Sequence, residues 1–347
     1  MSKRKTRSHT QGTGFLIHHG TKPEPNPLVS TGFLPPPETV SQIITEAYST
    51  FLHVQDGRVA NYIPSLASTS PHLFGISLAD MNGNLYSVGD STHSFSMQSV
   101  SKPFVFALIL EIIGAHEAQE KIGVNNTGLP FNSVLALEMQ EGRTSNPMVN
   151  AGAIATTSLA PGDTAEERWR FIHDGLNHFA GRELTLDHDA YHSESATNQR
   201  NRGIAQLLEG YGKIYSNPEE ATDNYTKQCS LRVTTEDLAV MGATLADGGL
   251  NPLTKQQVVS PETCKRVLAV LASSGLYERS GEWLYNIGLP AKSGVSGGLV
   301  TISPGKGGVA SFSPPLDSAG SSVRGTLSAS FLSERLGLNL FASKPIQ

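Results

Sequence analysis

The chain has 347 residues with 16% charged residues and a formal net charge of -5, which gives no basic footprint for nucleic acid. A composition with 34 glycines and 20 prolines differs from that of a coiled coil or a disordered chain and is typical of an enzyme. Two cysteines, Cys229 and Cys264, cannot form a disulfide framework, and the apolar run 104–113 is too short to span a bilayer. We therefore expect a cytoplasmic protein with no nucleic-acid or membrane partner.

The first 35 residues differ in composition from the rest. Five basic residues precede the first acidic residue, Glu24, and the segment lacks the apolar core of a secretory signal. Gly12, Gly14 and Gly20 disfavour the amphipathic helix of an organelle transit peptide. We expect residues 1–35 to form a disordered tail, with a mitochondrial targeting segment as the alternative.

The first predicted elements are a helix and a hairpin. Apolar residues recur at spacings of three and four over residues 40–52, and three prolines at 35–37 precede this amphipathic pattern. Two apolar segments, 73–78 and 85–88, flank the dipeptide at 82–83, Asn-Gly, which is a strong hairpin signal.

The middle of the chain is predicted to be helical and its end to return to strands. Helical periodicity dominates residues 99–271, whereas strand patterns appear at 299–302 and 308–312, and a last helix is expected near 326–336. Because strands occur at both ends with helices between them, the simplest architecture is an antiparallel sheet from both termini with an inserted helical lobe. This is an α/β fold of the α+β kind.

The segment 99–102, Ser-Val-Ser-Lys, stands at the head of an apolar helix expected over 103–113. A spacing of three residues places the Ser99 hydroxyl and the Lys102 amine on one face. A partly desolvated lysine can take the proton of a serine nucleophile. Alone the tetrapeptide is a weak signal, because most such sequences are solvated helix ends.

A second candidate, Lys292-Ser293-Gly294, leads into the strand that begins near residue 299. Together with Ser-x-x-Lys, a Lys-Ser/Thr-Gly element marks penicillin-recognising serine enzymes, although an ordinary strand start is the alternative. A strand edge here offers a backbone N–H, such as that of Val295, to an oxyanion alongside the N–H of Ser99.

Two polar segments are candidates for substrate binding. Asn146 and Asn150 lie in a turn before small residues, where helix capping is the alternative interpretation. Glu194 and Asn201 would share one helix face two turns apart, and could bind an amino group and a carboxylate. Solvated capping residues are the alternative there.

Two other motifs are not expected to form sites. His188 and His192 have a spacing that can hold zinc, but no third ligand is evident, so we expect no metal. The glycine-rich segment 304–308 has no Ser or Thr after Lys306 and no following helix, so we interpret it as a hairpin turn rather than a phosphate loop.

Taken together, these segments resemble the serine-dependent, β-lactamase-like glutaminases. The matching segments, in family order, are 59–64, 98–102, 146–154, 193–202, 225–230, 275–277, 290–295 and 312–317. The resemblance implies a β-lactamase/penicillin-binding-protein-like fold. Its catalytic domain would span residues 36–345, with a sheet subdomain at about 36–98 and 275–345 and a helical lobe at about 99–274.

The resemblance also implies the chemistry. Ser99 would attack the side-chain amide of L-glutamine, Lys102 would accept its proton, and Tyr277 would pass a proton to the departing ammonia. Water would then hydrolyse the γ-glutamyl ester. The residues expected to contact glutamine are Tyr62, Ser99, Asn150, Glu194, Asn201, Tyr225, Tyr277 and Val295. Glu194 suits the α-ammonium, no metal or organic cofactor is needed, and a homo-oligomer, a dimer or tetramer, is expected.

Two residues depart from the family pattern, and two other functions are alternatives to a glutaminase. Ser296 stands where the family usually has glycine, and Ser321 where it has asparagine. A β-lactamase or penicillin-binding peptidase would carry Ser-Asp-Asn where residues 148–150 are Met-Val-Asn, and would carry an export signal. A non-catalytic binding protein on this fold is expected to lose Ser99, Lys102 or Tyr277, yet the chain keeps all three.

Overall fold

The computed structural model describes residues 33–139, 142 and 145–343. The tail predicted over residues 1–35, with its targeting alternative, therefore lies almost wholly outside the described residues. Among the described residues, no single helix is both long and apolar enough to cross a membrane. Only the pair Gln98–Ile113 and Ala115–Lys121, bent by 119°, meets those criteria jointly.

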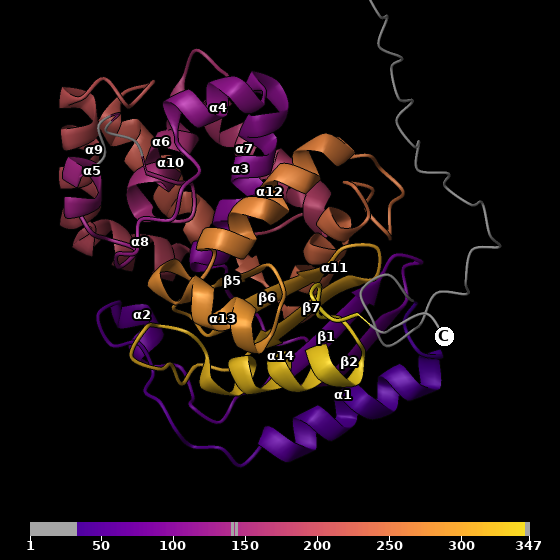
Figure 1. Cartoon of the computed structure of the whole chain (residues 1–347). Coiled ribbons are helices and arrows are strands. Elements are labelled where there is room, and N and C mark those ends of the chain that lie inside the picture. The colour runs from indigo at the N-terminus through magenta and orange to yellow at the C-terminus, as the bar shows by residue number, and fades with distance from the viewer. Residues whose placement is uncertain (1–32, 140–141, 143–144, 344–347) are drawn as a thin grey trace, which may run out of the picture.

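A five-stranded antiparallel sheet joins the two ends of the chain (Figure 1). Its strand order is β2-β1-β7-β6-β5. The strands are β1 (Gly75–Asp80), β2 (Leu85–Gly89), β5 (Ala291–Ser293), β6 (Gly298–Ser303) and β7 (Gly307–Phe312). In the pairing of β1 with β7, Gly75 lies opposite Phe312, so residues more than 200 positions apart are neighbours in the sheet. The predicted sheet from both termini is confirmed, as are the two predicted hairpins.

Helices cover both faces of this sheet. On one face lie α1 (Pro37–Phe51) and α14 (Val323–Arg335), and on the other lies α11 (Thr235–Ala246) (Figure 1). Neighbouring residues of one strand point to opposite faces, so Val309 packs with the α1 side and Ala310 with the α11 side. A Cβ at Gly308 would stand 2.4 Å from the Ala239 carbonyl oxygen, so α11 can approach this closely only against glycine.

Most of the remaining helices form a lobe above the sheet, with α3 (Lys102–Ile113) at its centre, whereas α2 (Pro64–Ala67) and α13 (Ser280–Asn286) lie near α14 (Figure 1). Every residue of α3 from Lys102 to Leu110 is buried, because α6 (Asn150–Ser158), α7 (Ala165–Ala180) and α12 (Pro261–Ser274) pack around it. The other helices are α4 (Ala115–Lys121), α5 (Leu135–Met139), α8 (His188–Thr197), α9 (Gln199–Gly210) and α10 (Pro218–Cys229). Two 3-10 helices, η1 (Gln98–Ser101) and η2 (Tyr277–Arg279), and a small sheet of β3 (Phe95–Ser96) and β4 (Arg232–Val233) complete the fold.

Two local predictions need correction. Ser99 lies in the 3-10 helix η1, and the α-helix begins at Lys102 rather than at residue 103, although the two side chains still stand one turn apart. Glu194 and Asn201 do not share one helix. Asn198, at φ -89° and ψ 22°, ends α8 and precedes α9, so the two residues approach the same place from two helices.

Candidate active site

A cavity of about 120 Å³ lies where the helical lobe meets the edge of the sheet. The structure brings all eight residues predicted to contact substrate into its lining: Tyr62, Ser99, Asn150, Glu194, Asn201, Tyr225, Tyr277 and Val295. They come from six helices or 3-10 turns and two loops, so only the tertiary fold unites them. Tyr62 is 55% exposed and forms the rim, whereas Tyr225 and Tyr277 are buried.

The backbone at the nucleophile position is held in a strained conformation. Gln98, directly before Ser99, has φ 53°, in the left-handed region that non-glycine residues rarely adopt. Its side-chain amide donates to Glu194 and to Ser96 Oγ, and its carbonyl accepts a 2.9 Å hydrogen bond from Ser101 Oγ. These contacts offset the strain and fix Ser99 at the end of the cavity.

Lys102 stands buried behind Ser99, with 1% of its surface exposed. Its Nζ donates a 2.8 Å hydrogen bond to Asn150 Oδ1, and no carboxylate among the described residues forms an ion pair with it. Burial lowers the pKa of Lys102 to about 7, because the charged form loses its hydration. A neutral amine, which can accept a proton, is therefore well populated near neutral pH.

Tyr277 lies near both Ser99 and Lys102, and its ring centroid is 5.6 Å from Lys102 Nζ. Burial raises the pKa of its phenol, and a hydrogen bond between the side chains of Ser99 and Tyr277 opposes that shift. The phenol oxygen also accepts a 2.9 Å hydrogen bond from Lys292 Nζ. Burial and the nearby Lys102 hold the pKa of Lys292 well below its ordinary value. A raised pKa keeps the phenol protonated at neutral pH, so its O–H is available as a hydrogen-bond donor.

Lys292 was not among the predicted site residues. The sequence analysis names Lys292 as the first residue of the Lys-Ser-Gly segment but predicts no contact for its side chain. In the structure β5 carries it into the interior, where Nζ also donates to the Ser293 carbonyl at 2.9 Å. Lys292 is thus hydrogen-bonded to the phenol that interacts with the Ser99 side chain.

Asn150 connects Lys102 to the far end of the cavity. Its Oδ1 accepts from Lys102 Nζ at 2.8 Å and from the Tyr225 hydroxyl at 3.2 Å, while its Nδ2 donates to Asn201 Oδ1 at 2.9 Å. Because the ammonium or amine of Lys102 approaches Oδ1 as donor, the amide orientation is fixed. Amide and phenol groups therefore converge between the nucleophile and the polar end.

Glu194 supplies the carboxylate at that polar end. It is half-buried, and its burial raises its pKa to about 7, while the hydrogen bond from Gln98 opposes the shift. A carboxylate that is held without a cationic partner, among the described residues, attracts a substrate cation. Cys229 also lines the cavity, but burial raises the pKa of its thiol to about 12, so the thiol is a poor nucleophile.

The backbone places a hydrogen-bond donor beside Ser99. A Cβ on Gly294 would lie 3.1 Å from the Met97 carbonyl oxygen and 3.3 Å from Gln98 Cβ, so the end of β5 packs directly against η1. The following residue, Val295, lines the cavity, and its N–H has no acceptor among the described residues. It is free to donate to an oxyanion that forms at Ser99.

Comparison with known proteins identifies the family. A family model described as Glutaminase matches residues 57–341. The chain is 56% identical over 317 residues to Glutaminase 2 of Yersinia pestis, covering 91% of this chain and 93% of that protein. It is 45% identical to a glutaminase of Colwellia psychrerythraea, covering 88% and 99%.

This chain belongs to the glutaminase family.

Solved structures agree with this assignment. The probable glutaminase ybaS superposes with a TM-score of 0.87 at 44% identity, covering 88% of this chain and 99% of that one. A probable glutaminase from Bacillus subtilis, complexed with 6-diazo-5-oxo-L-norleucine, has a TM-score of 0.74 at 29% identity, covering 88% and 94%. The predicted family, the β-lactamase-like fold class and the assignment as an amidohydrolase enzyme are confirmed.

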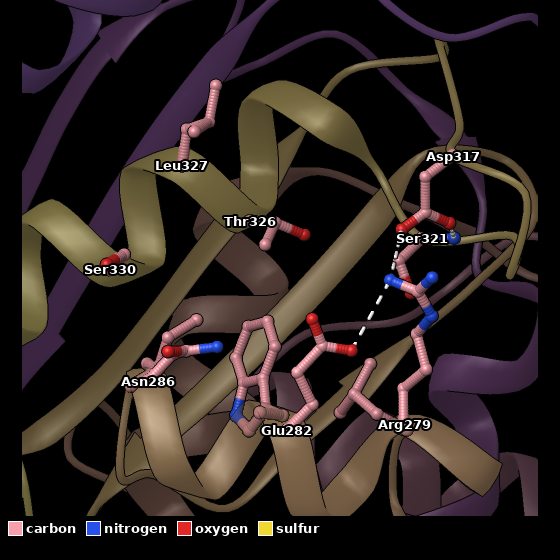
Figure 2. Close-up of a pocket in the computed structure, with 11 residues that line it drawn as sticks. Arg279, Glu282, Asn286, Asp317, Ser321, Thr326, Leu327 and Ser330 are labelled. Atoms are coloured by element: carbon pink, nitrogen blue, oxygen red, sulfur yellow. Dashed lines mark hydrogen bonds and ion pairs between the residues drawn. The ribbon is translucent and has the colours of Figure 1, made fainter.

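A larger cavity of about 340 Å³ lies on the other side of η2 in this glutaminase, between α13 and α14 (Figure 2). Arg279 projects into it between Glu282 and Asp317, with Nη1 3.6 Å and 3.9 Å from their carboxylate oxygens (Figure 2). Ser321, one of the two departures from the family pattern, lines it as well. None of the eight residues predicted to contact substrate is among its lining residues within the described chain.

The other departure, Ser296, follows the Val295 donor. Ser296 is buried, and its Oγ makes no hydrogen bond within the described part of the chain. Gly297 follows with φ 106°, a conformation that favours glycine, and its N–H donates to the Gly294 carbonyl at 3.0 Å. The turn 294–297 that presents Val295 is therefore closed by a hydrogen bond, with Ser296 as its third residue.

Proposed function

We propose that this glutaminase hydrolyses the side-chain amide of L-glutamine to L-glutamate and ammonia through a Ser99 acyl-enzyme. The observation that carries the proposal is that Ser99 lines the cavity one turn before a buried lysine with a pKa of about 7 and interacts with the Tyr277 phenol. A hydroxyl flanked by a base that can be neutral and by a proton donor is suited to nucleophilic acyl transfer.

The shape and charge of the cavity favour an amino acid as substrate. Its volume of about 120 Å³ is below the range typical of drug-sized ligands, which argues against the larger β-lactams and peptides of the alternative enzymes. Glu194 would bind the α-ammonium, and the amides of Asn150 and Asn201 with the Tyr225 hydroxyl would bind the carboxylate end. Tyr62 would close the rim over the bound amino acid.

The reaction follows from these positions. The Ser99 oxygen attacks the amide carbon while its proton passes to neutral Lys102, and the negative oxygen accepts hydrogen bonds from the Val295 and Ser99 N–H groups. Tyr277 donates a proton to the departing nitrogen, so that ammonia leaves and a γ-glutamyl ester remains. Water then attacks the ester and gives its proton to the Tyr277 phenolate, while Lys102 returns its proton to the Ser99 oxygen as glutamate is released. The protein supplies every group in this sequence from its own side chains and backbone.

Ammonia release tests the proposal. Purified protein should release ammonia from L-glutamine and leave L-asparagine and a β-lactam unchanged. Consumption of asparagine or of the lactam with glutamine intact would overturn the assignment of substrate.

The domain limits and the assembly remain predictions. We propose one catalytic domain over residues 36–345, which contains the 57–341 matched by the family model. The expected homo-oligomer, a dimer or tetramer, is tested by light scattering of the purified chain.

A further inference from the structure

The backbone of Tyr277 is strained. Its φ of 57° lies in the left-handed region, where an L-residue with a bulky side chain is disfavoured. Such a conformation persists only when surrounding contacts hold it. The position of the phenol beside Ser99 therefore depends on the groups that hold the η2 backbone.

Two side chains hold the Tyr277 carbonyl. Ser280 Oγ donates to it at 2.8 Å from within the same turn. Asn126 Nδ2 donates to it at 3.1 Å from a loop 151 positions earlier in the chain. The same Asn126 amide nitrogen donates to the Ser273 carbonyl near the end of α12. One side-chain amide thus connects the C-terminal end of α12, at Ser273, with Tyr277, the first residue of η2.

The orientation of the Asn126 amide is set by its other atom. Oδ1 accepts a 2.6 Å hydrogen bond from the Gly128 N–H, which only an oxygen can do. The amide nitrogen must then face the two carbonyls. The two ends of this side chain therefore make different contacts. Oδ1 accepts a hydrogen bond within the loop, and Nδ2 donates to the Tyr277 carbonyl.

The loop that carries Asn126 also contacts other parts of the site. The Phe131 ring lies 5.4 Å from the Tyr277 ring between centroids, and the Phe131 carbonyl accepts a 2.8 Å hydrogen bond from the Asn150 N–H. The segment 126–131 therefore touches both the Tyr277 side of the nucleophile and the Asn150 side. A shift of this loop would move the proton donor relative to Ser99.

We infer that Asn126 is a positioning residue for Tyr277: its amide nitrogen holds the strained η2 backbone so that the phenol reaches Ser99. The inference rests on the proton-donor role proposed above for Tyr277. Asn126 touches neither the cavity nor the expected substrate position, because it is not among the cavity-lining residues. Its effect should therefore appear in the turnover number and not in glutamine binding.

The test is the near-isosteric Asn126→Asp variant. Aspartate keeps an oxygen for the Gly128 N–H, but its ionised carboxylate cannot donate to the Tyr277 and Ser273 carbonyls. We expect kcat for glutamine to fall about tenfold with KM changed less than about twofold, because small displacements of catalytic groups act on the chemical step. Asn126 is exposed, so the variant leaves no buried void.

Asn217→Asp is the matched control. Asn217 is an exposed asparagine outside the cavity lining, whose Oδ1 accepts from the Glu219 and Glu220 N–H groups at the start of α10. The same chemical change there should leave kcat within about twofold of wild type. Equal losses of kcat in both variants would overturn the inference, as would an Asn126→Asp enzyme with wild-type kcat.

A double-mutant cycle separates positioning of the phenol from general damage. In a Tyr277→Phe background, followed at high enzyme concentration over hours, adding Asn126→Asp should change kcat less than about twofold. A further tenfold loss in that background would overturn the inference. Full activity of Tyr277→Phe alone would instead refute the proton-donor role in the proposed mechanism, which distinguishes the two failures.

Discussion

Replacing Lys102 by methionine is expected to abolish turnover and, at pH 6, to stabilise the folded protein. Methionine has a similar length and packs readily in an apolar interior. Lys102 is 1% exposed and has a folded-state pKa of about 7, against an ordinary value of 10.5. The folded protein therefore pays a desolvation penalty for the charged lysine that the unfolded chain does not.

The size of this penalty follows from the pKa difference. At about 1.4 kcal/mol for each pH unit, it corresponds to about 5 kcal/mol when both states are protonated. Removing the lysine also removes a donor to Asn150 Oδ1, which costs about 1–3 kcal/mol for a buried acceptor. The Tyr225 hydroxyl still donates to that oxygen at 3.2 Å, which limits the loss. We expect a net gain of about 2–4 kcal/mol in the free energy of unfolding at pH 6.

The gain depends on pH with a definite sign. The folded-state pKa is depressed, so between about pH 7 and 10.5 the unfolded chain holds a proton that the folded chain does not, and wild-type stability rises with pH. Lys102→Met lacks this term. Its advantage should be full below pH 7 and should shrink by about 2–3 kcal/mol between pH 6 and 9.

Urea unfolding at matched protein concentration measures these free energies, with the fluorescence of Trp169 and Trp283 and far-UV circular dichroism as probes. Lys265→Met is the control, because that lysine side chain is 69% exposed and its replacement should change stability by less than about 0.5 kcal/mol at every pH. A Lys102→Met protein that is less stable than wild type at pH 6, or whose advantage is the same at pH 6 and 9, would refute a depressed pKa for Lys102 and its role as base.

Three further predictions concern the reaction. Ser99→Ala should release no ammonia but should still bind glutamine, as measured by calorimetry, because only the attacking oxygen is lost. Turnover by this variant at the wild-type rate would rule out Ser99 as the nucleophile. Glu194→Gln should raise KM for glutamine about 10- to 100-fold, the value of a hydrogen bond to a charged group, and an unchanged KM would show that the α-ammonium binds elsewhere. For wild type, kcat/KM should rise from pH 6 to 8, because Lys102 must be neutral and Glu194 ionised, each with a pKa of about 7; a flat profile would contradict both assignments.

The local pattern of the sequence was sufficient to predict the elements and the family. Val40, Ile43, Ile44 and Ala47 are buried along one face of α1, as their spacing required. The Asn-Gly dipeptide gave the β1–β2 hairpin, and the spacing of Ser99 and Lys102 gave a single helical turn. These features depend on contacts within a few residues, which a sequence pattern encodes directly.

Other features required contacts between distant segments. The prediction that one helix carries Glu194 and Asn201 was wrong. Asn198 lies outside helical geometry and separates α8 from α9. The sequence marked Lys292 as part of a motif, but its hydrogen bond to Tyr277 forms only when β5 packs against η2's turn. The two residues are 15 positions apart, and no short sequence pattern links them.

The sequence by itself thus determined the reactive groups, their order and the family to which the chain belongs. The tertiary structure decided their protonation and alignment: it buried Lys102 until its pKa fell to about 7, and it held Tyr277 in a left-handed backbone conformation beside Ser99. Desolvation is a property of everything that surrounds a group, and strain is tolerated only when distant contacts hold it. A tetrapeptide supplies a serine and a lysine, but only the folded chain lowers the pKa of the lysine.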